Sequence, residues 1–249
     1  MPFTAPIRAI TLDLDDTLWP SRPVLLHAEQ ALTAWLREHA PATLAAMTPQ
    51  RRRELREGLL AEHPRRSHDV SFLRRESLRH AMRAAGDDHR RADEAFEVFL
   101  AARQQVTLYD DVAPVLTRWA TRYRVIALTN GNADVARVGL GAYFHAVVAA
   151  HEFDVGKPDP LIFLHACRAA GVEPAEVLHV GDDLELDVLA ARAAGLQAAW
   201  VRRPDLAVKD TMVAHATNEP RVFDSLQAVD RALILTPSAP SSPAMPSRC

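Results

Sequence analysis

The chain has 249 residues, 48% of them apolar and 24% charged, so it can bury a sizeable core like an ordinary globular protein. Its 29 Lys and Arg against 32 Asp and Glu give a net charge of −3, which argues against a surface built for general nucleic-acid binding. It has only two cysteines, no signal-peptide pattern and no apolar run near the ~20 residues that span a bilayer, so we expect a reduced, cytoplasmic protein without a membrane segment.

The first expected element is a buried strand over residues 7–14, an apolar run that ends in a cluster of acids. From about residue 22 to residue 105 the apolar residues recur at helical spacing, and no convincing strand interrupts them. Helices are expected there over 22–40, 49–62, 70–85 and 89–104. The arginine runs of this region, at 51–53, 65–66 and 74–75, are interpreted as solvated helix faces.

Beyond Tyr109 the pattern alternates between strands and helices. Strands are expected over 125–128, 146–150, 177–180 and 197–201, and helices over 112–122, 134–140, 160–170 and from 184 to 194. Such alternation implies a parallel sheet that is covered on both faces.

The sequence therefore predicts an α/β fold in which a Rossmann-like parallel sheet carries an inserted, all-helical cap domain. The core is expected to comprise residues 1–21 and 106–236, and the cap residues 22–105. The end of the chain, 237–249, is rich in Pro and Ser and is expected to be a disordered tail.

Polar clusters follow three of the predicted strands. Ligands of an open parallel sheet bind outside the carboxyl ends of its strands, so clusters that are far apart in sequence are expected to meet at one site. Lys157 lies in a loop before a helix and is expected to reach the same place. The expected site therefore contains Asp13, Asp15, Thr129, Asn130, Lys157, Asp182 and Asp183.

These residue types fit phosphoryl transfer. Clustered carboxylates raise one another's pKa values unless a cation lies between them, and oxygen ligands without His or Cys favour Mg²⁺. A lysine and a threonine hydroxyl beside that cation suit a phosphoryl group. One carboxylate can attack phosphorus, and a second one two residues on can protonate the departing oxygen.

Four segments resemble the motifs of the haloacid dehalogenase (HAD) superfamily. They are Asp13-Leu14-Asp15-Asp16-Thr17-Leu18, Thr129, Lys157 in its Gly-Lys-Pro-Asp-Pro setting, and Gly181-Asp182-Asp183 with Asp187. The resemblance covers residues 7 to about 205, and the helical insertion resembles the type-one cap of that superfamily.

The resemblance implies a magnesium-dependent phosphatase with an aspartyl-phosphate intermediate. Asp13 is then the nucleophile and Asp15 the general acid and base, and Mg²⁺ is held by Asp13, the backbone carbonyl of Asp15, and Asp182. Thr129, Lys157 and the backbone amides near Asn130 and Gly131 would bind the phosphoryl oxygens, with Asp183 or Asp187 supporting the site from behind. For Asp16 a turn-capping role and a direct role remain open, and His179 is interpreted as a core histidine rather than a ligand.

Two other reactions of the superfamily are disfavoured. The dehalogenases carry a non-acidic residue where this chain has Asp15. The phosphonate-cleaving members need a lysine from the cap, and residues 22–105 contain none.

Further stretches resemble the bacterial HAD phosphatases that act on FMN and on the ribitylaminouracil phosphate of riboflavin biosynthesis. These stretches are residues 17–24, 68–70, 128–133 and 177–184. We hypothesise that Trp19, Arg22, His68 and Asp69 line the cap side of the pocket, where an aromatic ring and a cation would suit a flat heterocycle with a polyol arm.

Other functions stay open at this point. They are a broad sugar-phosphate or nucleotide phosphatase, a phosphomutase, and a regulator on a HAD scaffold that has lost catalysis. The expected partner is a small-molecule phosphate ester, without nucleic acid or membrane, for a monomer or homodimer.

Overall fold

The computed structural model describes residues 3–204 and 221–235, whose six strands form one parallel sheet in the order β3-β2-β1-β4-β5-β6. The strands are β1 (Ala9–Leu12), β2 (Arg124–Thr129), β3 (Ala146–Ala149), β4 (Val177–Gly181), β5 (Gln197–Val201) and β6 (Arg221–Phe223). The strand order reverses between β1 and β4, which is the place where such sheets bind ligands. The predicted α/β fold with a parallel sheet is confirmed.

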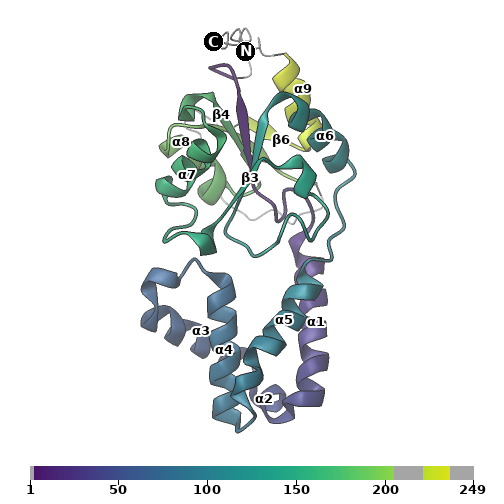
Figure 1. Ribbon diagram of the computed structural model, residues 1–249, viewed down its shortest axis with the longest axis vertical. Helices are drawn as coiled ribbons and strands as arrows, with labels where there is room; N and C mark the ends of the chain where they lie inside the picture. The colour runs from purple at the N-terminus through teal and green to yellow at the C-terminus, as the bar shows by residue number, and fades with distance from the viewer. Residues whose placement is uncertain (1–2, 205–220, 236–249) are drawn as a thin grey trace, which may run out of the picture.

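Helices cover both faces of this sheet. On one side lie α6 (Val112–Arg122) and α9 (Leu226–Ile234), and on the other lie α7 (Pro160–Ala170) and α8 (Ala190–Ala193), which a short helix over Leu184–Leu189 precedes (Figure 1). Every residue of β1 is buried, as expected for a central parallel strand that is covered from both sides.

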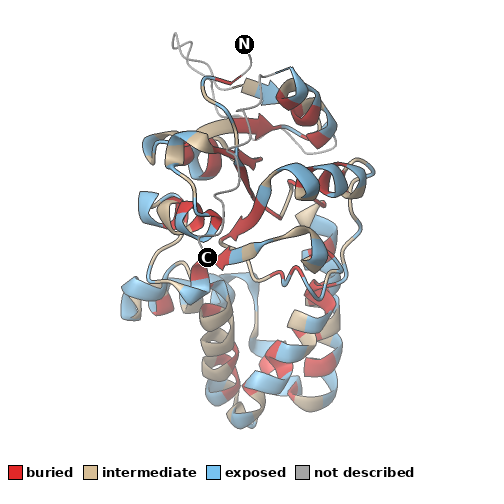
Figure 2. Cartoon of the chain, turned by 45° about the horizontal axis from the view of Figure 1, so that its top comes forward, coloured by how far each residue is buried: buried red, intermediate tan, exposed pale blue. Residues whose placement is uncertain are grey.

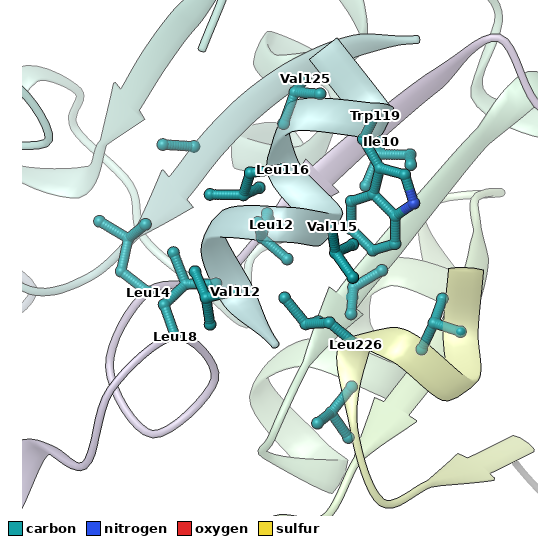
Figure 3. Packing of buried hydrophobic residues seen from close by; sticks show 14 of the residues in the cluster. Ile10, Leu12, Leu14, Leu18, Val112, Val115, Leu116, Trp119, Val125 and Leu226 are labelled. Atoms are coloured by element: carbon teal, nitrogen blue, oxygen red, sulfur yellow. The ribbon is translucent and has the colours of Figure 1, made fainter. Parts of the chain in front are cut away.

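The larger core cluster lies between the sheet and α6. Ile10 and Leu12 of β1 pack there with Leu116 and Trp119 of α6 (Figure 3). The indole Nε1 of Trp119 donates to Asp230 of α9 at 2.9 Å, so this buried carboxylate has a partner. The contact joins α9 to α6 across the core.

Five helices lie between β1 and α6 and form the lower part of the molecule in Figure 1. They are α1 (Ser21–His39), α2 (Pro41–Ala46), α3 (Pro49–Glu62), α4 (Val70–Ala85) and α5 (Ala92–Arg103). The apolar stripes of α1, α4 and α5 form a core of their own, and Figure 2 shows buried residues on α1 and α5 where these two helices face each other. This arrangement supports a division into core and cap, whose boundaries stay a prediction.

The structure departs from the sequence-based expectations at three places. Residues 135–139 form turns and not the expected helix, because Asp134 caps the first amides and Gly139, at φ 82°, ends the segment after about one turn. No element was predicted where β6 and α9 lie. The predicted tail, 237–249, lies outside the described residues.

No helix in the described ranges has the length and apolar character needed to cross a membrane.

Candidate active site

Three neighbouring strands bring the predicted acids and the threonine to one edge of the sheet. Asp13 directly follows β1, Thr129 is the last residue of β2, and Asp182 directly follows β4. Because β1 pairs with both β2 and β4, the three residues emerge side by side. The amide of Asp13 donates to the carbonyl of Val180 at 2.9 Å, which fixes the start of the loop.

Lys157 lies between two buried carboxylates. Its Nζ is 2.5 Å from Oδ1 of Asp13 and 2.6 Å from Oδ1 of Asp187. Burial alone would lower the pKa of Lys157, but the charges of these two acids outweigh burial and raise it, so the lysine is a cation at neutral pH. Burial, followed by the charges of Asp187 and Asp182, raises the pKa of Asp13 well above its ordinary value despite Lys157.

Asn130 fixes the backbone of Lys157. Its side-chain amide donates to the carbonyl of Lys157 at 2.7 Å, and its Oδ1 accepts from the amide of Lys157 at 2.8 Å. A Cβ at Gly156 would lie 2.8 Å from the same Oδ1, so the close approach requires glycine. The Asn130 side chain therefore positions the lysine, and the phosphate contact expected of Asn130 stays a prediction.

A group of three carboxylates fits a hard divalent cation. Asp13, Asp182 and Asp187 each offer an oxygen, and these oxygens lie within 4.8 Å of one another. The donor set contains no sulfur or imidazole, which suits Mg²⁺. The hydroxyl of Thr17, a residue that the sequence analysis did not assign, lies 3.5 Å from carboxylate oxygens of both Asp13 and Asp182.

Asp187 is supported from behind by a buried histidine. Nε2 of His179 lies 3.1 Å from Oδ1 of Asp187, and Nδ1 of His179 lies 2.9 Å from the hydroxyl of Thr11. Burial lowers the pKa of His179, so the neutral ring donates to Asp187 and accepts from Thr11. This geometry agrees with the interpretation of His179 as a core histidine.

The second acid, Asp15, is held from the cap. Arg103, at the end of α5, places Nη2 at 2.6 Å and 2.5 Å from its two oxygens, and Nε1 of Trp19 donates to Oδ1 at 2.9 Å. Sequence reasoning missed Arg103, which is 1% exposed. The signal was present, because Arg103 falls on the same helical face as Phe96 and Phe99, where an arginine is unexpected.

The next residue of the chain ties the cap to the loop after β2. Oε1 of Gln104 accepts from the amide of Asp134 at 2.7 Å, and its Nε2 donates to the carbonyl of Asn132 at 3.2 Å. The end of α5 therefore contacts two loops of the site, one through Arg103 and one through Gln104.

Gly131 lies against the carboxylate of Asp15. A Cβ there would come within 2.8 Å of Oδ2 of Asp15 and 3.2 Å of the Thr129 hydroxyl. Because Arg103 holds Asp15, we expect Gly131→Ala to displace the carboxylate and to lower kcat at least tenfold, about 1.4 kcal/mol. Steady-state kinetics measures the loss. Gly58→Ala, where a Cβ meets nothing within 4 Å, is the control, and equal kinetics for both variants would contradict this expectation.

Two of the predicted acids cap helices. Both side-chain oxygens of Asp16 accept from Ser21 at 2.8 Å, at the start of α1, and its φ of 59° marks a tight turn. Asp183 accepts from the amides of Glu185 and Leu186. For Asp16 the geometry favours the turn-capping alternative.

The four hypothesised substrate contacts lie elsewhere in the site region. Trp19 is fully buried, Arg22 is exposed at the start of α1, His68 bonds to a backbone carbonyl of the core, and Asp69 caps α4. None of the four lines the cavity of about 420 Å³ that opens on Asp15. Their role as substrate contacts stays a prediction, which this placement does not support.

Comparison with known proteins identifies the family. The model of the haloacid dehalogenase-like hydrolases matches residues 7–195. The chain is 34% identical over 200 residues to the 5-amino-6-(5-phospho-D-ribitylamino)uracil phosphatase YigB of Escherichia coli (strain K12), which covers 79% of this chain and 84% of that protein. It is 32% identical over 210 residues to the glyceraldehyde 3-phosphate phosphatase of Methanopyrus kandleri, with the same coverage of 79% and 84%.

One solved structure is similar in both sequence and fold. The crystal structure of a 2-haloacid dehalogenase from Pseudomonas syringae pv. Tomato DC3000 is 39% identical and has a TM-score of 0.84, over 92% of this chain and 98% of that one. Phosphatases recur among the relatives that match most of this chain. The chain therefore belongs to the haloacid dehalogenase-like hydrolases and is a phosphoric monoester hydrolase among them.

Proposed function

We propose that this enzyme hydrolyses a small-molecule phosphate monoester with the help of Mg²⁺ and through an aspartyl-phosphate on Asp13. The substrate we propose is 5-amino-6-(5-phosphoribitylamino)uracil or FMN. The observation that carries the proposal is the meeting of Asp13, Asp182 and the cationic Lys157 at the carboxyl end of the central strand.

In the first step Asp13 attacks phosphorus and forms an acyl phosphate, while the alcohol leaves. Lys157 and the Thr129 hydroxyl bind the phosphoryl oxygens and offset their charge. We assign the cation to Asp13, Asp182 and the backbone carbonyl of Asp15, because Asp187 already accepts from Lys157, His179 and the amide of Asp183. Bound there, Mg²⁺ would neutralise charge between the phosphate and the nucleophile.

Asp15 serves both halves of the reaction. Its carboxyl gives a proton to the departing alcohol, and the resulting carboxylate then takes a proton from the water that cleaves the acyl phosphate. Arg103 and Trp19 hold this group in place at the mouth of the cavity.

Dehalogenation is the second candidate, because a structure that is 39% identical carries that name. The same ester-type attack by Asp13 on a carbon would displace a halide. Asp15 argues against it, since no leaving alcohol needs a proton there and a carboxylate would repel the carboxylate of a haloacid.

The test is a panel of phosphate esters assayed with and without Mg²⁺. We expect removal of the metal by a chelator to lower the rate at least 100-fold and added Mg²⁺ to restore it. Ribitylaminouracil phosphate and FMN should exceed simple sugar phosphates at least tenfold in kcat/KM, and 2-chloropropionate should release no halide. Equal rates on sugar phosphates would favour a phosphatase of broad specificity. Transfer of the phosphoryl group to a second sugar would favour a mutase, and no turnover on any ester would favour a non-catalytic regulator.

A further inference from the structure

A cavity inside the cap connects directly to the acid/base residue. It measures about 420 Å³, is lined by residues of α1, α3, α4 and α5, and reaches Asp15 and Gly131 of the core. A two- or three-carbon alcohol would leave most of it unfilled, whereas its volume falls in the range of roughly 300–1,000 Å³ that small-molecule pockets show. The cavity is therefore sized for a ring system.

Apolar side chains make up much of its wall. Leu32, Leu73 and Phe99 are buried along it, while Leu25 and Val70 line it with 40% and 39% of their surface exposed. A flat apolar ring in the cavity would cover these two residues and remove their apolar surface from water.

One N–H donor of Arg103, at the end of the cavity nearest Asp15, has no hydrogen-bond partner among the residues that the structure describes. Its Nη2 bonds to Asp15, but its Nη1 is buried and has no hydrogen-bond partner within the described residues. Arg103 lines the cavity. A buried, unpaired N–H is costly, so the position calls for an oxygen acceptor such as a hydroxyl next to the ester bond.

Besides Arg103 and Asp15, three guanidinium groups and one acid, Glu29, line the cavity. Glu29 accepts from Arg74 at 2.6 Å and from Arg52 at 3.4 Å, while Arg56 forms no ion pair in the part of the chain that the structure describes. Arg74 also stacks on the ring of Phe99, with its Cζ 3.7 Å from the centroid. This side is therefore cationic and offers planar donors to acceptor oxygens.

We infer that this cavity binds the leaving alcohol of the substrate, and that the alcohol carries hydroxyls near the ester and a flat ring with carbonyl oxygens at its far end. Arg103 binds a hydroxyl, the leucines and Phe99 cover the ring, and Arg74 with Arg56 binds the carbonyls. The inference rests on the proposed phosphatase function and places specificity inside the cap. It differs from the earlier hypothesis about Trp19, Arg22, His68 and Asp69.

The test compares two adjacent arginines of α4. Arg75, like Arg74, stacks on a phenylalanine and pairs with a glutamate, but it does not line the cavity. We expect Arg74→Met to raise KM for FMN about tenfold with kcat within threefold, and so to lower the FMN preference over glycerol phosphate about tenfold. Arg75→Met should leave that preference unchanged, and equal effects of the two variants would overturn the inference.

A filling variant and a binding assay give independent readouts. Ser77→Trp should occupy the cavity and weaken binding of riboflavin, which carries the ring without phosphate, at least tenfold as measured by quenching of its fluorescence. Undiminished riboflavin binding in a folded Ser77→Trp variant would contradict the assigned place. Because this assay needs no turnover, a wild-type enzyme that binds riboflavin but hydrolyses no ester would refute the proposed function and leave the cavity assignment standing.

Discussion

Replacing Asp13 with asparagine should lower kcat by roughly 10⁴-fold or more, because an amide cannot form the acyl phosphate. The fold should survive, since Asn fits the same space and Lys157 keeps its ion pair with Asp187. Rapid acid quench of the wild type with labelled substrate should trap phosphate on the protein, and the variant should trap none.

Thermal unfolding supplies the control for Asp13→Asn. Burial and two neighbouring acids already disfavour the charged form of Asp13, so a neutral amide should cost little stability. A variant that keeps its melting temperature and still turns over at one tenth of the wild-type rate would show that the nucleophile lies elsewhere.

Asp15→Asn should produce a loss of activity that depends on the leaving group. An alkyl phosphate such as FMN needs a proton on its departing oxygen and should lose about 10³-fold, whereas p-nitrophenyl phosphate needs far less help in that step and should lose less. The acyl phosphate on Asp13 should then accumulate, because the base that activates water is also gone. Burst kinetics on p-nitrophenyl phosphate measures this accumulation.

The neighbouring acid serves as the matched control. Asp16 caps α1 through Ser21, and Asn can accept the same backbone bond, so Asp16→Asn should stay within about threefold of the wild type. Equal losses on good and poor leaving groups in Asp15→Asn would refute the acid role of Asp15.

The sequence predicted the sheet and the convergence of the site because both follow from local patterns. The strand β1 is an apolar run that ends at Asp13, and β4 ends at Asp182, so the rule for parallel sheets places these acids together. The cap helices could also be predicted from their helical spacing. In the core, the helix expected over 134–140 was wrong, because a segment of about one turn is too short to form a stable helix.

The contacts between cap and core could not be predicted from these local sequence patterns. Helical spacing shows which face of α5 is buried but not what that face meets, so the pairing of Arg103 with Asp15, 88 positions away, stayed hidden. For the same reason, Arg74 was interpreted as part of a solvated face, although it lies over Phe99 and lines the cavity.

The last turn of α5 has a consequence for how the enzyme admits its substrate. Arg103 holds Asp15 while the adjacent Gln104 holds the loop that follows β2, so two neighbouring residues at the end of α5 join the cap to two loops of the candidate site. Movement of the cap away from the core would separate the Arg103 guanidinium from Asp15. The same movement would break the contacts of Gln104 with the loop after β2. With the cap open, Asp15 would lose the partner that positions it, so the first step would wait until the substrate is bound and the cap is closed over it.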